Sequence, residues 1–343
     1  MPESVEADPI TPAEELEPDE RRTLAGQATL SNLAERFGLV VAWLLICIVF
    51  TIWLPGTFAT WTNFQTIFGS QTVLLLLTMG LVVSLSAGEF DLSIASVAGF
   101  VGTLFAVFTF RDGWATVPAL VAVLAIGLLV GLINAFFIVR INVPSLVMTL
   151  GMSTLLVGVG IGIAGPEAIS LGELSLVTTA NERLFSLPLA WYFAIVLVLL
   201  LYYLLEHTPI GRYIRFVGAS HEVSRLSAIR VGGVRTLALV GSSMFAAVAG
   251  VVMVLLQGAA EINATSSLLL PAFAGAFLGA TAIAPRRFNV WGSLIAVYFL
   301  VTGTTGLQLA GLAGWVEQTF YGVSLIVGVA VAQLLVRSAR LSR

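Results

Sequence analysis

Long stretches of hydrophobic residues without any charge alternate with short polar segments along most of the chain. A helix needs about 20 mostly apolar residues to cross a bilayer, so each stretch predicts one membrane span. The stretch between Arg36 and Glu89 is long enough for two spans, and Pro55-Gly56 marks a turn between them. The predicted spans are about 38–55, 66–86, 91–110, 114–139, 143–165, 186–205, 234–257, 265–284, 290–311 and 315–336.

This pattern predicts an all-α polytopic membrane protein with about ten transmembrane helices. Eight full spans with two re-entrant pieces fit the same stretches nearly as well. Either even number places both termini on one side. The chain contains no lysine, and of its 16 basic residues, all arginine, only Arg111 and Arg183 fall on the opposite side. Because cytoplasmic loops are enriched in basic residues, both termini are expected in the cytoplasm.

Composition narrows the function classes. Hydrophobic residues make up 58% and charged residues 10% of the chain, against about 25% charged in soluble domains, which excludes a single soluble domain. The missing lysine excludes a P-loop ATP site in this chain. Cys47 is the one cysteine, and His207 and His221 have no partners at metal-ligand spacing, so no metal site and no catalytic constellation are expected. No basic patch suited to nucleic acid is present.

The two ends differ in composition from the spans. Residues 1–37 are acidic and proline-containing, which predicts a disordered cytoplasmic head. Residues 38–336 form the predicted transmembrane domain, and 337–343 a short cytoplasmic tail.

The longest cytoplasmic loop, 206–233, is basic and contains a short amphipathic stretch. Ser220 is placed to cap a short helix there, in which Val223, Leu226 and Ile229 share one apolar face. Such a helix either docks on a partner protein or lies on anionic membrane lipid. The residue pattern favours neither alternative.

Two carboxylates interrupt a long apolar region at 87–96. Glu89 and Asp91 lie there, followed by Ser93. Charged groups near the membrane interior mark a pathway, a partner or a helix cap. Asp91 followed by Ser93 is typical of a helix start, so a cap at the membrane surface is the plainer interpretation.

Other polar groups carry weaker signals. The outer loop 166–185 is acidic, and it predicts either a rim helix that contacts an external protein or a plain connector. Isolated polar residues are expected mainly in loops and helix packing, with some lining a path. They are Gln71, Asn134, Asn142, Gln257, Glu261, Asn263, Gln308 and Glu317.

Three segments resemble, in order, motifs of the ribose-type (simple sugar) ABC transporter permeases. Gly88-Glu-Phe-Asp-Leu-Ser-Ile-Ala95 resembles the family's G-G-I-D-L-S-V-G signature. Pro144-Ser-Leu-Val-Met-Thr-Leu-Gly-Met152 resembles its P-[AS]-[FL]-[IV]-x-T-L-G-M segment. Residues 211–229 resemble its G-R-x-x-x-A-[IV]-G-x-[ND]-x-x-A-A-x-x-S-G-[IV] cytoplasmic loop, and the likeness extends over about 38–336.

The resemblance implies the ABC importer permease fold and a set of partners. The cytoplasmic loop would dock on a separate ATPase subunit that carries ATP and Mg²⁺, so this chain would hold no cofactor. An external or periplasmic substrate-binding protein and a second permease copy, identical or related, would complete the complex in a bacterial plasma (inner) membrane. Residues of the ATPase-coupling loop would be Gly211, Arg212, Gly218, Glu222, Val223, Ser224, Arg225, Leu226 and Ile229. Residues of the translocation path or its motifs would be Gly88, Asp91, Ser93, Asn134, Pro144, Thr149 and Gly151.

The chain departs from the family pattern in one loop. Where the family often has G-G-T-S-x-x-G-G-x-G, Gly279 and Thr281 are kept, but Pro285, Arg286 and Arg287 replace the glycine cluster. Ala228 stands where glycine is common. These differences put the substrate in question and suggest altered coupling.

The function expected is therefore a non-enzymatic permease subunit that forms the path for a sugar or related small polar solute. Three alternatives remain. One is an ABC permease of the same superfamily for branched-chain amino acids or nucleosides. Another is an ion-coupled secondary transporter or channel, which would use Glu89 or Asp91 as its coupling carboxylate. The third is a membrane scaffold or sensor.

Overall fold

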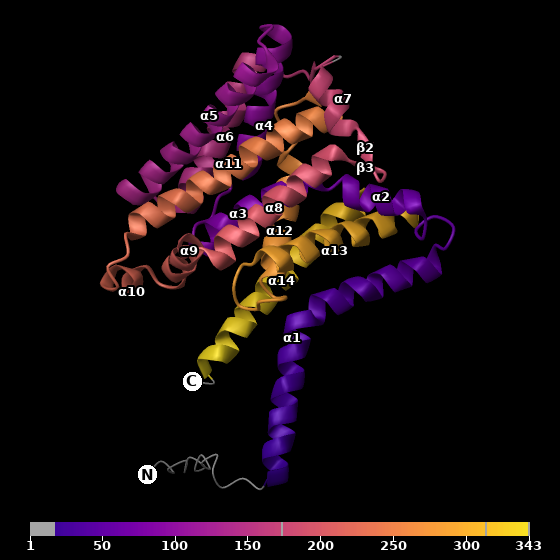
Figure 1. Ribbon diagram of the computed structural model, residues 1–343, viewed down its shortest axis with the longest axis vertical. Helices are drawn as coiled ribbons and strands as arrows, with labels where there is room; N and C mark the ends of the chain where they lie inside the picture. Colours follow the sequence, from indigo (N-terminus) through magenta and orange to yellow (C-terminus); the bar gives the residue numbers. More distant parts are fainter. Residues whose placement is uncertain (1–17, 173, 313, 342–343) are drawn as a thin grey trace, which may run out of the picture.

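The computed structural model describes residues 18–341 except 173 and 313, and side chains within 36–334. It is a bundle of helices with short two-residue strands at one end (Figure 1). The first half comprises α1 (Pro18–Trp53), α2 (Trp61–Gly69), α3 (Thr72–Ser86), α4 (Ile94–Ala106), α5 (Thr116–Ala135), α6 (Ser145–Ala164) and α7 (Ser175–Asn181). The second half comprises α8 (Leu189–His207), α9 (Pro209–Ala219), α10 (His221–Leu226), α11 (Val231–Gln257), α12 (Leu269–Gly279), α13 (Val290–Leu309) and α14 (Trp315–Leu341).

Nine helical segments of the described chain are long and apolar enough to cross a membrane. They confirm the predicted polytopic fold and coincide with nine of the ten predicted spans; α2 and α3 together form one of them, Trp61–Ser86. The tenth prediction, 265–284, is too long. Only Ser266–Gly279 is helical there, as a 3₁₀ turn, η3 (Ser266–Leu268), followed by α12, and the chain then enters a turn-rich loop.

The predicted boundary of the acidic head also differs from the structure. Helix α1 begins at Pro18 and continues through residue 37 into the first span without a break. Residues 1–17 lie outside the described part of the chain, so the predicted disorder there stays a prediction.

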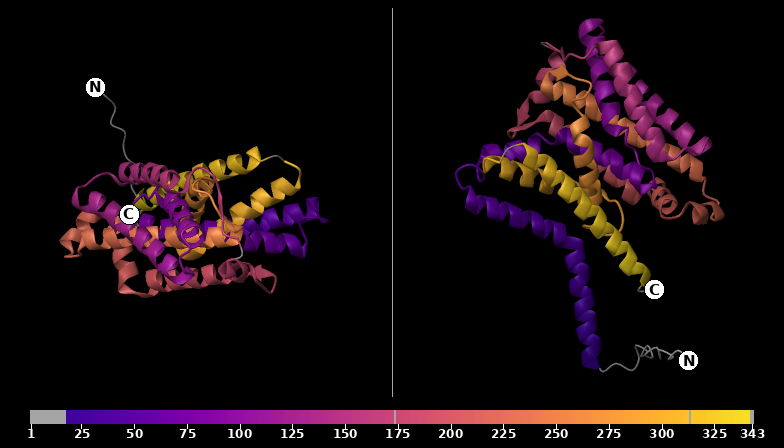
Figure 2. Two further views of the ribbon diagram at one scale, coloured as in Figure 1. Left: turned by 90° about the horizontal axis from the view of Figure 1, so that it is seen from above. Right: turned by 180° about the vertical axis from the view of Figure 1, so that it is seen from behind.

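Helices α3 and α4 form the centre of the bundle. Every residue of both is buried, because both are apolar on all sides and other helices surround them. Helix α11 packs against α3, α4 and α5, while α12 packs against α13 and α14. Figure 2 shows α1 lying beside the α13–α14 pair. The outer helices α1, α5, α6, α8 and α14 carry many exposed large apolar side chains, as expected where helices face lipid.

Contacts between loops define the two ends of the bundle. At one end lie α7, the strand pairs β1 (Ile169–Ser170) with β4 (Ala259–Ala260), and β2 (Arg183–Leu184) with β3 (Leu187–Pro188). This is called the α7 end. The turn 87–93, the α9–α10 segment and the α12–α13 loop meet at the opposite, α9–α10 end. Residues 166–185, except 173, contain the short helix α7, and Asn181 at its end donates a hydrogen bond to the Leu255 carbonyl at 2.9 Å.

Candidate functional site

The α9–α10 segment forms two short helices joined at Ser220; the short helix after Ser220 and its cap were predicted, whereas α9 was not. The Ser220 side chain caps α10 by accepting a hydrogen bond from the Val223 amide at 3.3 Å. Ser224 is fully buried, and its Oγ lies 3.0 Å from the Phe216 carbonyl oxygen and 2.7 Å from that of Ser220. Because its hydroxyl reaches back to α9, Ser224 fixes the angle between the two helices. Gly211, at the start of α9, is buried against the last turn of α8.

The far side of α10 presents apolar side chains to solvent. Val223 is 52% and Leu226 89% exposed. The predicted three-residue face is wrong at Ile229, which lies beyond the end of α10. The chain leaves the helix through Ala228 at φ 58°, and the Ile229 amide donates back to the Ser224 carbonyl at 3.1 Å. The other predicted loop residues, Arg212, Gly218, Glu222 and Arg225, are all exposed.

The same segment rests directly on the turn after α3. A Cβ added to Gly218 would lie 2.1 Å from the Ser86 carbonyl oxygen, so the two backbones are in contact. His221 Nε2 lies 3.4 Å from the Ala87 carbonyl oxygen. Gly88, at φ 84°, turns the chain beside them. Two motifs that are far apart in the sequence therefore meet at one point.

The turn continues into a buried polar cluster centred on Asp91. The Asp91 carboxylate is fully buried. Its Oδ1 accepts from the Ser93 amide at 3.0 Å and the Ser93 hydroxyl at 2.6 Å, and its Oδ2 accepts from the Ser242 hydroxyl of α11 at 2.7 Å. Asn134 of α5 donates to Ser93 Oγ at 3.0 Å. Asp91 therefore holds Ser93, the residue immediately before α4, from inside the bundle and not at its surface, and no side chain of the described residues caps the helix itself.

Helix α6 closes the cluster from another side. Thr149 Oγ1 accepts from the Leu92 amide at 3.0 Å, and Ser145 Oγ accepts from the Phe90 amide at 3.3 Å. Pro144 immediately precedes α6 and is exposed. Gly151 lies on the outer face of α6, where an added Cβ would meet nothing within 4 Å. The structure therefore brings Asp91, Ser93, Asn134 and Thr149 together, with Gly88 beside them, but leaves Pro144 and Gly151 outside the cluster.

Two residues of α11 that bond to this region were missed in the sequence. Arg235, near the start of α11, forms an ion pair with the buried Glu89, a residue that the sequence had singled out. Ser242 lies two turns further along α11 and bonds Asp91. Arg235 and Ser242, seven positions apart, fall on one helix face, which is the signal that could have indicated a shared partner.

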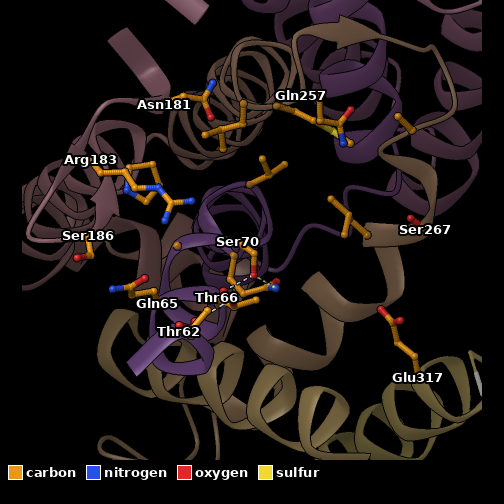
Figure 3. Close-up of a pocket in the computed structure, with 18 of the residues that line it drawn as sticks. Thr62, Gln65, Thr66, Ser70, Asn181, Arg183, Ser186, Gln257, Ser267 and Glu317 are labelled. Carbon is orange, nitrogen blue, oxygen red and sulfur yellow. Dashed lines mark hydrogen bonds between the residues drawn. The ribbon is translucent and has the colours of Figure 1, made fainter. Parts of the chain in front are cut away.

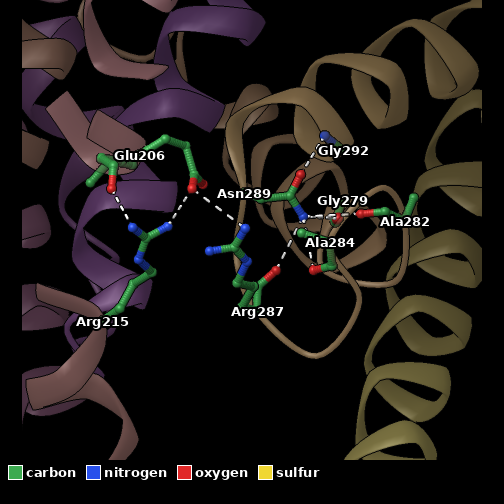
Figure 4. A network of polar contacts seen from close by, with 9 residues as sticks. Glu206, Arg215, Gly279, Ala282, Ala284, Arg287, Asn289 and Gly292 are labelled. Atoms are coloured by element: carbon green, nitrogen blue, oxygen red, sulfur yellow. Dashed lines mark hydrogen bonds and ion pairs between the residues drawn. The ribbon is translucent and has the colours of Figure 1, made fainter. Parts of the chain in front are cut away.

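The loop that departs from the family pattern is joined to the α8–α9 corner by an ion-pair network (Figure 4). Glu206 Oε2 lies 2.8 Å from Arg215 Nη1 and 3.4 Å from Arg287 Nη2. Asn289 holds the loop itself: its Nδ2 donates to the Gly279 and Ala282 carbonyls at 2.9 and 3.0 Å, and its Oδ1 caps α13 at the Gly292 amide. Asn289 therefore joins the last residue of α12, Gly279, to the loop that follows it and to the start of α13.

Removing Arg287 is expected to have a small effect. The Arg287→Gln variant loses one partly exposed ion pair, so we expect a loss of at most about 1 kcal/mol of unfolding free energy, diminished in high salt. Glu206→Gln is expected to cost more, because it removes the carboxylate that both Arg215 and Arg287 contact. Thermal unfolding of both single variants and of the double variant, in detergent at low and high salt, measures the interaction energy between Glu206 and Arg287. A loss of unfolding free energy that does not change with salt would contradict an electrostatic role.

A polar pocket lies at the opposite, α7 end (Figure 3). It is lined by residues of α2, α7, β2 and α11 and by Glu317 near the start of α14. Gln71, Gln257 and Glu317 were expected mainly in loops and packing, and the structure places all three at this pocket. Their positions in separate spans gave no sign that they converge.

The nine long apolar helices of the described chain define a multi-pass membrane protein. The family model described as "Branched-chain amino acid transport system / permease component" matches residues 63–329. The chain belongs to this family of ABC transporter permeases. No solved structure matches it.

Curated proteins of similar sequence are also named as permeases. The chain is 28% identical over 322 residues to the Ribose import permease protein RbsC of Escherichia coli (strain K12), covering 90% of this chain and 98% of that protein. It is 28% identical over 307 residues to the Autoinducer 2 import system permease protein LsrD of Yersinia pseudotuberculosis (87% and 92%). It is 25% identical over 318 residues to the Probable ABC transporter permease protein YphD of Escherichia coli (strain K12) (92% and 94%).

Proposed function

We propose that the chain is the membrane subunit of an ATP-driven importer for a sugar or a related small polar solute. The observation that carries the proposal is the α9–α10 segment, which exposes Val223 and Leu226 on one side and rests on the turn before Asp91 on the other. Exposed apolar residues rimmed by charged ones are typical of a docking surface. A partner on this surface would act directly on the centre of the bundle.

The partner is a separate ATPase subunit that binds ATP and Mg²⁺, since no P-loop lysine exists in this chain. The α9–α10 end then faces the cytoplasm, together with both termini, and the α7 end faces a substrate-binding protein outside the bacterial plasma (inner) membrane. A second permease copy, identical or related, completes the solute path. The arginine asymmetry of the loops supports this orientation.

The geometry supplies a route for the mechanical signal. Closure of the ATPase subunits moves α10, and Gly218 transmits the movement through backbone contact to the end of α3. Glu89 with Arg235, and Asp91 with Ser242, then connect this turn to α11. Since α11 packs against α3, α4 and α5, a small displacement at the turn shifts these helices together.

Sugar is favoured over amino acid as the solute class by the relatives. The names of RbsC and LsrD state import of ribose and of autoinducer 2, whereas the family description names branched-chain amino acids. Uptake assays with both classes decide between them. Uptake that needs a proton or sodium gradient and no ATPase would contradict the proposal and favour an ion-coupled transporter.

The docking surface is tested by the Leu226→Glu variant. Leu226 is 89% exposed, so the substitution leaves the permease fold intact but places a charge in the apolar contact. We expect the amount of ATPase co-purified from native membranes to fall about tenfold, as for loss of a central contact residue. Leu312→Glu, an exposed leucine in the α13–α14 loop at the α7 end, is the matched control and should retain the ATPase.

Two results would contradict the proposal. One is an unchanged yield of ATPase with Leu226→Glu. The other is a permease oligomer that never carries an ATPase with P-loops, even after mild crosslinking.

A further inference from the structure

The pocket at the α7 end has the size of a binding site for a small molecule. Its volume is about 730 Å³, within the range of about 300–1,000 Å³ that is usual for ligand sites. The walls come from segments that are distant in sequence: Thr62 to Val73, Asn181 to Pro188, Met253 to Leu268, and Glu317 with Tyr321. None of the motifs that resemble the family signature contributes to it.

Polar side chains without partners converge on this pocket (Figure 3). Within the described chain, the side chains of Gln65, Arg183, Gln257 and Ser267 make no hydrogen bond or ion pair to another residue. The amides of Gln65 and Gln257 and the hydroxyl of Ser267 can each donate and accept hydrogen bonds. Such a set matches a solute whose hydroxyl groups both donate and accept.

The charges that face the pocket offset each other. Arg183 lies on one side and Glu317 on another, and the remaining labelled lining residues are neutral (Figure 3). Glu317 already accepts a hydrogen bond from Gln308 at 2.8 Å. A wall with one positive and one negative group has no net attraction for ions, so the pocket favours a neutral solute. Apolar side chains, Met253 and Leu256 among them, line the rest of it.

Broken helices form two of the walls. The span Trp61–Ser86 is interrupted at Ser70 and Gln71, between α2 and α3, and both residues line the pocket. On another side, the 3₁₀ turn η3 precedes α12 and contributes Ser267 and Leu268. Irregular backbone within a span is tolerated where it is buried in protein or lines a cavity, and transporters place solute sites at such breaks.

We infer that this pocket is a binding site for a neutral, hydroxyl-rich solute of monosaccharide size, on the side from which the binding protein delivers it. The inference rests on the proposed function, since that assigns the α7 end to the outside. It goes further by naming the site and the residues that contact the solute: the amides of Gln65 and Gln257 and the hydroxyl of Ser267.

Protection of an introduced thiol tests the site in the intact complex. In native membrane vesicles, Ser267→Cys on a Cys47→Ser background is labelled with a charged, impermeant methanethiosulfonate, with and without D-ribose, D-glucose or myo-inositol. We expect at least one of these compounds to slow labelling several-fold. Thr178→Cys, on the exposed face of α7 outside the pocket, is the control and should be labelled at an unchanged rate.

Removing the Gln257 amide distinguishes protection by a solute bound in the pocket from non-specific protection of the thiol. With Gln257→Leu in the Ser267→Cys background, the concentration of sugar that halves the labelling rate should rise about tenfold, whereas Asn263→Leu, outside the pocket, should leave it unchanged. Protection by none of the three compounds, or equal protection by L-leucine, overturns the inference. Because ATPase co-purification is measured on the same vesicles, loss of protection with the ATPase retained rejects this site alone. Protection without any ATPase rejects the proposed importer but leaves the site.

Discussion

Replacing Gly218 with alanine is expected to reduce transport at least about tenfold and to weaken the fold at the α9–α10 end. The added Cβ would lie 2.1 Å from the Ser86 carbonyl oxygen and 2.9 Å from its carbonyl carbon. These are backbone atoms of the last turn of α3, whose residues are all buried, so they cannot move aside as a flexible side chain would. Overpacking of this kind costs about 1–3 kcal/mol or more, and we expect a loss near the upper end of that range.

The loss of solute uptake should be larger than the loss of folded protein can account for. If α10 transmits movement through the Gly218 contact, lifting α9 from the turn separates the docking surface from the Asp91 cluster. We therefore expect ATPase still bound to the permease, ATP hydrolysis that continues, and solute uptake reduced at least about tenfold. Uptake and ATP hydrolysis in proteoliposomes measure the two separately.

A second glycine in the same region provides the matched control. Gly233 is exposed near the start of α11, and an added Cβ would meet only Arg230 Cβ, at 4.0 Å. Alanine is the better helix former, so Gly233→Ala should leave stability unchanged or slightly raised. Equal uptake in the Gly218→Ala and Gly233→Ala proteins would show that close contact at Ser86 is not needed.

The membrane spans could be predicted because their signal is local. Each helix must satisfy its own backbone in the bilayer, so length and apolar character within one stretch are sufficient. The prediction was too long at 265–284, because the residues after Gly279 are uncharged and mostly apolar but form a loop that Asn289 holds, and the hydrophobic pattern does not distinguish this loop from the span. The cap at Ser220 was also local, and the structure confirms it.

The arrangement of the polar groups could be predicted only in part. Asp91 and Ser93 were recognisable because they interrupt an apolar region, and Asn134 and Thr149 were placed near them by the resemblance. Their connection to Ser242 depends on how α11 crosses α4, which no single stretch of sequence specifies. The pocket was missed for the same reason, since Gln65 and Gln257 converge only after four segments have packed together.

The chain also departs from the family pattern in a way that the structure explains. In the loop where the pattern that the chain resembles often has glycines, Arg287 reaches Glu206 at the end of α8, and Arg215 of α9 shares that carboxylate. The α12–α13 loop is thus joined to the same segment that carries the proposed docking surface. Under the proposed mechanism, a movement of α9 would reach α12–α13 through Glu206 as well as α3–α4 through Gly218, and the partly exposed ion pairs would form the weaker of the two connections.

Replacing Asp91 with alanine is expected to have the largest effect on stability. The variant leaves the Ser93 amide, the Ser93 hydroxyl and the Ser242 hydroxyl without their acceptor inside the bundle. Each buried donor that loses its partner costs about 1–3 kcal/mol, so for three donors we expect a total loss of roughly 3–9 kcal/mol, with poor expression at 37 °C as a consequence. Thermal unfolding in detergent measures the loss.

The Asp91→Asn variant separates hydrogen bonding from charge. Its carbonyl oxygen can still accept from Ser93, and the Ser242 hydroxyl can rotate to accept from the new amide. If Asp91 joins α4 to α11 only through hydrogen bonds, Asp91→Asn should keep most of the stability and of the ATP-dependent uptake, and Ser242→Ala should be similarly mild. If Asp91→Asn instead folds well but loses uptake completely, the negative charge itself is required, as in an ion-coupled carrier. Because the carboxylate is enclosed by α4, α5 and α11 and accepts three hydrogen bonds, we expect the first result.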